Sequence, residues 1–173
     1  MKLKKPNHIG IVVKNISEAA ERYGRIYGIS KWWEIVCDGK LDMTYLGEKR
    51  NCKVKLYYGG KGSTKIELIE TTGDDNIYTK FYAKRGEGMH HIMYNVKNLS
   101  EAIRLCEGNG LKVIQSANFK SGGAKVRYAY MAESEDSVVL ELVETTIAFG
   151  IKKGDMPFEM QLGTLTGSYK RVK

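Results

Sequence analysis

The sequence has few cysteines, and their spacing shows no pairing. Cys37, Cys52 and Cys106 are odd in number and far apart, and no Cys-x-x-Cys motif occurs. This pattern argues against a disulfide scaffold and against a zinc site built from thiolates. We therefore predict reduced cysteines that serve for packing, as expected in a reducing compartment.

Long apolar runs are also absent. No stretch approaches the roughly 20 apolar residues that a membrane-spanning helix needs, and the basic start of the chain is not followed by the apolar core of a secretory signal. With 42% hydrophobic and 28% charged residues, the composition is that of an ordinary globular protein. We expect a cytoplasmic protein with no membrane association.

Basic residues outnumber acidic ones, but no nucleic-acid motif accompanies them. The formal net charge is +8, and the lysines and arginines are spread along the 173 residues, with one short basic cluster at Tyr169–Lys173. We therefore expect no nucleic-acid partner. The charge favours an anionic small molecule as the ligand.

An internal repeat is the most informative feature of the chain. His8–Ala20 returns as His91–Ile103 with 8 identical positions, and Ile66–Thr72 returns as Leu140–Thr146. The histidine segment comes first and the glutamate segment last in both halves. Such similarity at both ends, in the same order, predicts two related modules.

The repeat and the hydrophobic patterns together predict the fold class: an α+β protein of two tandem βαβββ modules that form a cupped mixed sheet around a metal site. Asn15 or Ser17 is expected to begin the first helix and Gly28 to end it, and Gly110 is expected to end the second. The predicted organisation is module one at 1–72, a linker at 73–86, module two at 87–146 and a C-terminal extension at 147–173. Strands are predicted at 8–13, 32–37, 65–70, 90–96, 112–117, 125–131 and 138–144, with two more within 42–58, and helices at about 17–27 and 99–108.

The repeat places one histidine and one glutamate at matching points of each module. His8 corresponds to His91, and Glu67 corresponds to Glu141. A pseudo-twofold axis relates matching points, so two imidazoles and two carboxylates converge if both pairs point inward. Side chains alternate between the faces of a strand, so we expect His90 to point away from His91.

Burial supports an inward position for the glutamates. Glu67 lies between Ile66 and Leu68, whose face we expect a helix to bury, and a lone buried carboxylate would be very costly. The repeat also pairs Glu70 with Glu144, on the opposite face of the strand from the first pair. Taken singly, such histidines are more often structural and such glutamates solvated, but their presence in both copies favours a shared metal site.

Two imidazoles and two carboxylates make a mixed nitrogen and oxygen site. This donor set suits Mn, Fe, Co, Ni or Zn better than Ca, which prefers oxygen ligands alone. Four protein ligands on an octahedral ion leave two positions for two oxygens of one ligand, which the ion would polarise. We therefore predict one divalent ion held by His8, Glu67, His91 and Glu141.

At these residues the sequence resembles the vicinal oxygen chelate superfamily, which includes glyoxalase I, methylmalonyl-CoA epimerase, extradiol dioxygenases and bleomycin-resistance proteins. The resemblance rests on His8–Val13, Ile66–Leu68, His91–Met93 and Leu140–Leu142, and it covers about residues 5–146. It implies paired βαβββ modules around a metal ion and a homodimer.

Within the superfamily, Gly86–Ile92 is most similar to methylmalonyl-CoA epimerases. That resemblance implies an enolate intermediate, with Glu141 as both ligand and acid/base. Those epimerases can carry a second carboxylate on a central strand of module one, whereas Lys53–Tyr57 contains no acid and Glu48 lies nearby. A glyoxalase-I-like lyase and a non-catalytic binding or resistance protein are the alternatives. The aromatic residues expected either to line a pocket or to pack in the core are Trp32, Trp33, Tyr45, Tyr128 and Tyr130.

Overall fold

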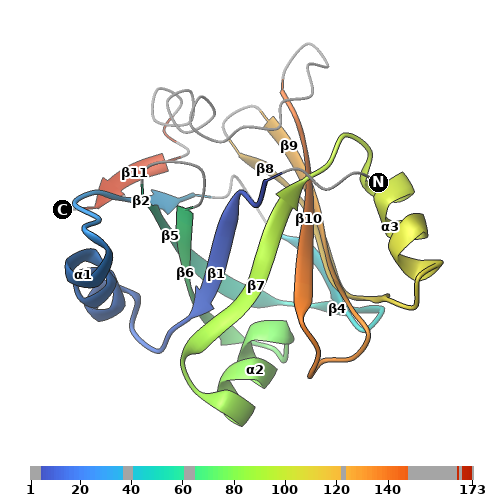
Figure 1. Cartoon of the computed structure of the whole chain (residues 1–173), viewed down its shortest axis with the longest axis horizontal. Coiled ribbons are helices and arrows are strands. Elements are labelled where there is room, and N and C mark those ends of the chain that lie inside the picture. The colour runs from blue at the N-terminus through green and yellow to red at the C-terminus, as the bar shows by residue number, and fades with distance from the viewer. Residues whose placement is uncertain are drawn as a thin grey trace.

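The computed structural model describes residues 5–36, 41–60, 65–121, 124–147, 167 and 169–172, and these form one curled mixed sheet of 11 strands with three helices (Figure 1). Cys37 and most of the predicted C-terminal extension lie outside the described residues. The elements are β1 (His8–Val12), α1 (Ile16–Tyr27), β2 (Trp32–Ile35), β3 (Asp42–Tyr45), β4 (Glu48–Arg50), β5 (Cys52–Gly59), β6 (Lys65–Gly73), α2 (Ile77–Arg85), β7 (Gly88–Asn95), α3 (Leu99–Glu107), β8 (Lys112–Ser121), β9 (Ala124–Ala132), β10 (Val139–Thr146) and β11 (Tyr169–Val172).

The strand order repeats between the two halves of the sheet. The first half runs β2-β5-β6-β1 and the second runs β7-β10-β9-β8. In each half the strand that comes first along the chain is parallel to the one that comes last, as β1 is to β6 and β7 is to β10. The halves join where β1 and β7 pair antiparallel. This topology confirms the predicted fold class.

Helices α1 and α3 lie on opposite flanks of the curled sheet (Figure 1). The Asn15 side chain accepts hydrogen bonds at the start of α1, and Gly28 ends this helix in the left-handed conformation with φ 65°, both as predicted. Helix α3 ends at Glu107 with Gly108 as its cap, two residues before the predicted Gly110. No described helix is long and apolar enough to cross a membrane.

The outer face of the sheet is covered by these two helices. Helix α1 packs Ile16, Ala19 and Ala20 against a cluster that includes Trp32, so this tryptophan belongs to the outer core rather than to a pocket. Helix α3 packs the thiol of Cys106 into a second outer cluster. Cys52 and Cys106, the two cysteines among the described residues, are free thiols.

The region 42–58 contains three strands, so the prediction of two was wrong. Strands β3 and β4 form a hairpin through Leu46 and Gly47, whose φ values of 51° and 83° are those of a tight two-residue turn. The hairpin pairs with β8, at the far edge of the second half. At the opposite edge of the sheet, β11 pairs with β2. Pairings across such sequence distances leave no local pattern in the chain.

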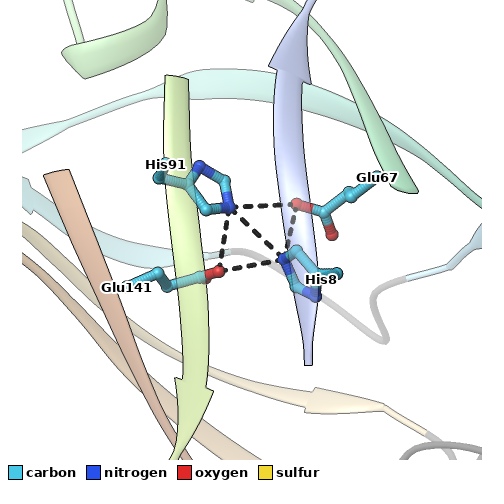
Figure 2. A group of neighbouring side chains, drawn as sticks. All are labelled: His8, Glu67, His91 and Glu141. Atoms are coloured by element: carbon cyan, nitrogen blue, oxygen red, sulfur yellow. Dashed lines mark hydrogen bonds and ion pairs between the residues drawn. The ribbon is translucent and has the colours of Figure 1, made fainter. Parts of the chain in front are cut away.

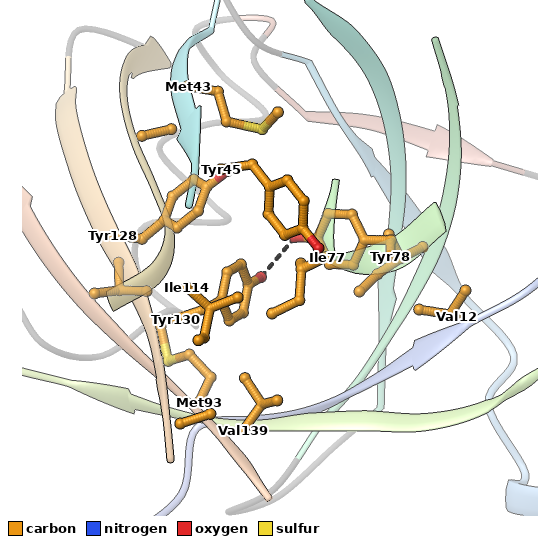
Figure 3. Close-up of a cluster of buried hydrophobic side chains, with 14 residues drawn as sticks. Val12, Met43, Tyr45, Ile77, Tyr78, Met93, Ile114, Tyr128, Tyr130 and Val139 are labelled. Atoms are coloured by element: carbon orange, nitrogen blue, oxygen red, sulfur yellow. Dashed lines mark hydrogen bonds between the residues drawn. The ribbon is translucent and has the colours of Figure 1, made fainter. Parts of the chain in front are cut away.

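The predicted linker contains a helix that sequence analysis does not predict. Helix α2 begins after Asn76, which forms a capping box with Thr79. The backbone N–H of Ile77 donates to Oε1 of the buried Gln115 at 3.1 Å, and this bond attaches the helix to β8. As a result Ile77 and Tyr78 are buried inside the cup, where they join the main apolar cluster (Figure 3).

Candidate metal centre

Four adjacent strands position the predicted metal ligands. In the register of the sheet, Gly10 is paired on one side with Glu67 and on the other with His91. Met93 is likewise paired with His8 and with Glu141. In each of these sets of three register partners, a histidine and a glutamate lie on either side of a central residue. The pseudo-twofold relation between the halves of the sheet also relates the two sets.

The structure brings the four side chains together (Figure 2). The Nε2 atoms of His8 and His91 lie 3.3 Å apart. Oε2 of Glu141 lies 3.2 Å from His8 Nε2 and 3.1 Å from His91 Nε2. Oε2 of Glu67 lies 3.4 Å from His8 Nε2 and 3.7 Å from His91 Nε2. One donor atom from each residue is within 4.8 Å of all the others.

These separations fit donors arranged around one ion. Ligands about 2.1 Å from a metal lie roughly 3.0 Å apart at adjacent octahedral positions and roughly 3.4 Å apart in a tetrahedron. Oε2 of Glu141 is buried and has no aligned hydrogen-bond donor among the described residues, although two imidazole nitrogens are close to it. The four donor atoms are therefore grouped closely enough to share one ion.

Burial makes this cluster strongly charged and tightly coupled. Burial of His8 acts to lower its pKa, but Glu67 and Glu141 together outweigh it and raise the pKa of His8 to about 10. Burial acts to raise the pKa of Glu141, yet the two imidazoles hold the pKa of that carboxyl below its usual range. Two buried carboxylates require compensating positive charge, which a bound divalent ion would supply.

A polar neighbour holds the second ring nitrogen of each histidine. Nδ1 of His8 lies 3.3 Å from Oδ1 of Asn7, which also accepts a 2.7 Å hydrogen bond from the hydroxyl of Tyr58. Nδ1 of His91 lies 3.0 Å from Nδ1 of His90. With Nδ1 engaged in this way, both Nε2 atoms are available to the centre.

The prediction that His90 points away from His91 was wrong. It assumed an unbroken strand, whereas β7 has a bulge: Gly10 pairs with His91 and Ile11 pairs with Met89, so His90 has no partner in the register. The His90 ring lies against His91, with ring centroids 5.3 Å apart. Burial and the neighbouring His91 lower the pKa of His90 to about 3, so its neutral ring can accept a hydrogen bond.

Gly10 leaves the space that the ring of His91 occupies. A Cβ atom at residue 10 would lie 2.0 Å from Cε1 of His91 and 2.4 Å from its Nε2. No side chain fits at that distance. The glycine therefore allows the imidazole to lie directly over β1, with His91 only 1% exposed.

The second repeated pair of glutamates serves the helices instead of the centre. Oε2 of Glu70 accepts a 2.7 Å hydrogen bond from the backbone N–H of Ile16, at the start of α1. Oε2 of Glu144 accepts a bond of the same length from the N–H of Leu99, at the start of α3. Carboxylates stabilise helix N-termini, where backbone N–H groups lack partners.

A cavity of about 120 Å³ adjoins the centre. His8, Glu67 and Glu141 line one part of it, and apolar side chains form most of the remaining wall. The described residues that line the cavity include no lysine or arginine. The aliphatic and aromatic members of the wall include Leu41, Val54, Leu56, Met93, Phe119, Val126, Tyr128 and Val143.

Two tyrosines, Tyr78 and Tyr130, also line this cavity. The hydroxyls of Tyr78 and Tyr130 lie 2.6 Å apart, and burial raises the pKa of both well above the usual range. Tyr130 was one of several aromatic candidates, whereas Tyr78 lies in the predicted linker and has no local signal. Tyr45 belongs to the apolar cluster and not to the cavity wall.

Strand β5 carries no carboxylate, as the sequence of Lys53–Tyr57 indicates. Val54 and Leu56 of β5 line the cavity with apolar side chains. Glu48 lies on β4, where it is exposed and paired with Arg50 at 2.6 Å. Among the described residues of the cavity wall, the carboxylates are therefore Glu67 and Glu141.

The paired βαβββ halves and the central cluster of two histidines and two glutamates define a vicinal oxygen chelate fold. The family model described as the glyoxalase/bleomycin resistance protein/dioxygenase superfamily matches residues 7–130. The chain belongs to this superfamily.

Individual relatives are distant. An uncharacterised protein, YqjC of Bacillus subtilis, is 28% identical over 143 residues, which cover 80% of this chain and 90% of that protein. Mitochondrial methylmalonyl-CoA epimerase of Dictyostelium discoideum is 23% identical over 81% of this chain and 78% of its own. The crystal structure of methylmalonyl-CoA epimerase from Mycobacterium tuberculosis matches with a TM-score of 0.60 and 20% identity, covering 82% of this chain and 87% of that one. This last likeness concerns the fold alone.

Proposed function

We propose that His8, Glu67, His91 and Glu141 hold one divalent ion, and that the protein is a metal-dependent isomerase or epimerase acting on a small acyl-CoA-like acid through an enolate. The single observation that carries this proposal is the convergence of four buried donors beside an apolar cavity. Methylmalonyl-CoA epimerases among the relatives matched by sequence suggest the substrate class. A bound ion would supply Lewis-acid polarisation of two ligand oxygens.

The residues of the chain provide the remaining parts of this chemistry. Glu141 lines the cavity, and its carboxylate would take the proton from the carbon next to the substrate carbonyl. To invert that carbon, a proton must then return on the opposite face of the enolate. The apolar wall excludes water, which protects the enolate from unwanted protonation. Asn7 and His90 hold the two imidazoles in place.

The charge of the site favours a second candidate, a glyoxalase-I-like lyase acting on a neutral thiol adduct. Two carboxylates and two neutral imidazoles balance a divalent ion completely. An enolate of a malonyl-type acid would then bring two negative charges into a cavity whose described wall offers no lysine or arginine. A neutral hydroxy-carbonyl adduct would bring one charge fewer. Charges that are buried without partners are expensive.

A two-part experiment tests the proposal. Metal analysis of the purified protein should find about one divalent ion per chain, whereas a metal-free protein that still binds small molecules would indicate a sequestering protein. The loaded protein is then incubated in heavy water with methylmalonyl-CoA. Deuterium at the acidic carbon supports the epimerase. The lyase is favoured if no deuterium appears and the protein turns over the hemithioacetal formed from methylglyoxal and glutathione.

Glu141→Gln is the matched variant for both reactions. It keeps the shape of the side chain but removes the base, so both deuterium exchange and lyase turnover should fall. An unchanged rate in this variant would contradict the role proposed for Glu141.

A further inference from the structure

Tyr78 and Tyr130 form a hydroxyl pair and line the same cavity as the proposed catalytic carboxylate. Tyr130 on β9 is the register partner of Glu141 on β10, so the two side chains share the inner face of the sheet. Helix α2 brings Tyr78 to the same place, and the two hydroxyl oxygens lie 2.6 Å apart (Figure 3). Both tyrosines line the cavity together with His8, Glu67 and Glu141.

The pair has one hydrogen more than its own hydrogen bond uses. Two hydroxyls carry two hydrogens, and only one of these can lie between the two oxygens. Neither tyrosine hydroxyl has another hydrogen-bond acceptor among the described residues. Tyr78 and Tyr130 are only 3% and 1% exposed, so bulk water does not surround them. The remaining O–H is a buried donor without a protein partner, at the edge of a cavity.

The corresponding tyrosine of the first half does not offer this donor. Tyr58 on β5 is the register partner of Glu67, as Tyr130 is of Glu141. Its hydroxyl donates to Oδ1 of Asn7 at 2.7 Å, and Tyr58 does not line the cavity. Tyr58 therefore binds Asn7, which contacts His8, whereas Tyr130 lines the cavity that a ligand would occupy.

We propose that the Tyr78–Tyr130 pair donates a hydrogen bond to an anionic oxygen of the ligand that chelates the ion. This inference rests on the proposed function, because it takes the ligand to bind the ion through two oxygens. The pair gives the site a neutral donor where the described wall has no cation. It also assigns a role to helix α2, whose first turn holds Tyr78 through the bond from Ile77 to Gln115.

The test uses the full chain loaded with Co²⁺ and acetohydroxamate, a small anion that chelates through two oxygens, with binding followed in the visible spectrum of the ion. Tyr130→Phe and Tyr78→Phe should each bind Co²⁺ with wild-type affinity but bind acetohydroxamate about 10- to 100-fold more weakly, as expected for a lost bond to a charged oxygen. Tyr27→Phe is the control, since Tyr27 is 56% exposed on α1 and lies outside the cavity wall. It should change neither affinity.

The outcomes separate this inference from the proposed function. Failure of the wild-type protein to bind Co²⁺ overturns both. Normal Co²⁺ binding with unchanged acetohydroxamate affinity in both Phe variants overturns the tyrosine pair alone. If either variant fails to fold, the wild-type protein loaded with Zn²⁺ provides a second measurement by proton NMR. A tyrosine hydroxyl resonance should move downfield when acetohydroxamate is added, and a spectrum without such a change overturns the pair.

Discussion

The two halves of the molecule supply the same proposed metal ligands but support them differently. In each half a histidine stands on the first strand and a glutamate on the last, and the residue before the histidine contacts its Nδ1. That residue is Asn7 in the first half and His90 in the second. The pseudo-twofold relation therefore extends beyond the four ligands to the groups that hold them.

The differences lie where the ligands meet the cavity. The repeat aligns Gly10 with Met93. Gly10 of the first half leaves space for the ring of His91, whereas Met93 of the second half lines the cavity. His8 lines the cavity, and His91 does not. Tyr58 supports the ligand shell, while Tyr130 faces the cavity. A symmetric scaffold thus carries an asymmetric site, in which the first half presents its histidine to the cavity and the second presents Met93 and Tyr130.

The largest effect should come from comparing the two carboxylates. If Glu141 is the base and Glu67 mainly a ligand, Glu141→Gln should lower the rate of deuterium exchange or lyase turnover by about 10²- to 10⁴-fold. Glu67→Gln should lower it less at saturating metal. Rates are measured with the metal content of each variant determined in parallel. Equal losses in the two variants would show that the halves share the acid/base role.

Gly10→Ala should break the centre through steric overlap. The new Cβ would occupy the position of the His91 ring, and losing this ligand should reduce metal affinity beyond the roughly 100-fold limit typical of outer-shell changes. Gly88→Ala is the matched control on β7, where a Cβ would meet its nearest atom at 3.9 Å. Calorimetric titration with Zn²⁺ measures both variants. Normal affinity in Gly10→Ala would mean that His91 is not a ligand.

Replacing His90 tests whether the contacts of Asn7 and His90 with the two histidines have the same role. His90→Phe retains a ring beside Phe81 and Tyr130 but removes the acceptor for His91, so Zn²⁺ affinity should fall by about 10- to 100-fold. His90→Asn installs the residue type that the first half uses at the matching position, and it should recover part of the loss. If His90→Phe binds Zn²⁺ as tightly as the wild type, the contact is only packing.

Metal affinity should rise with pH, because the ion displaces a proton from His8. The pKa of His8 in the metal-free protein is about 10, above its ordinary 6.5. The stability that its pairing with the carboxylates provides is therefore fully present below about 6.5 and is lost as the pH rises through about 10. Below that value, each pH unit should change affinity about tenfold. Calorimetry at pH 8 in buffers of different ionisation enthalpy should detect release of about one proton, and no release would contradict a protonated His8.

The repeat made much of this site predictable. His8 matches His91 and Glu67 matches Glu141, so the pseudo-twofold relation between the halves predicted that the four side chains converge if both pairs point inward. Alternation failed at His90, where a bulge breaks the strand. Local pattern also could not show that the β3–β4 hairpin pairs with β8, since that partner is more than 60 residues away.

Helix α2 shows the second limit of local reasoning. Its nine residues do not separate polar from apolar side chains by face, so the segment has the character of a linker. The helix is stabilised by its capping box at Asn76 and by tertiary contacts of Ile77 and Tyr78. The tyrosine pair depends on these contacts, and therefore no sequence signal could have pointed to it.

The smallest effect concerns the glutamates that serve the helices equally in both halves. Glu70→Gln and Glu144→Gln should each reduce the free energy of unfolding by about 1 kcal/mol, because a neutral amide accepts more weakly at a helix N-terminus. Urea denaturation measures the loss, and Zn²⁺ affinity in the same variants should stay within about twofold of wild type, since neither carboxylate reaches the ion. A larger loss for Glu144 would extend the asymmetry of the site to the helices. Equal losses would confine that asymmetry to the inner face of the sheet, where the two halves meet the ligand.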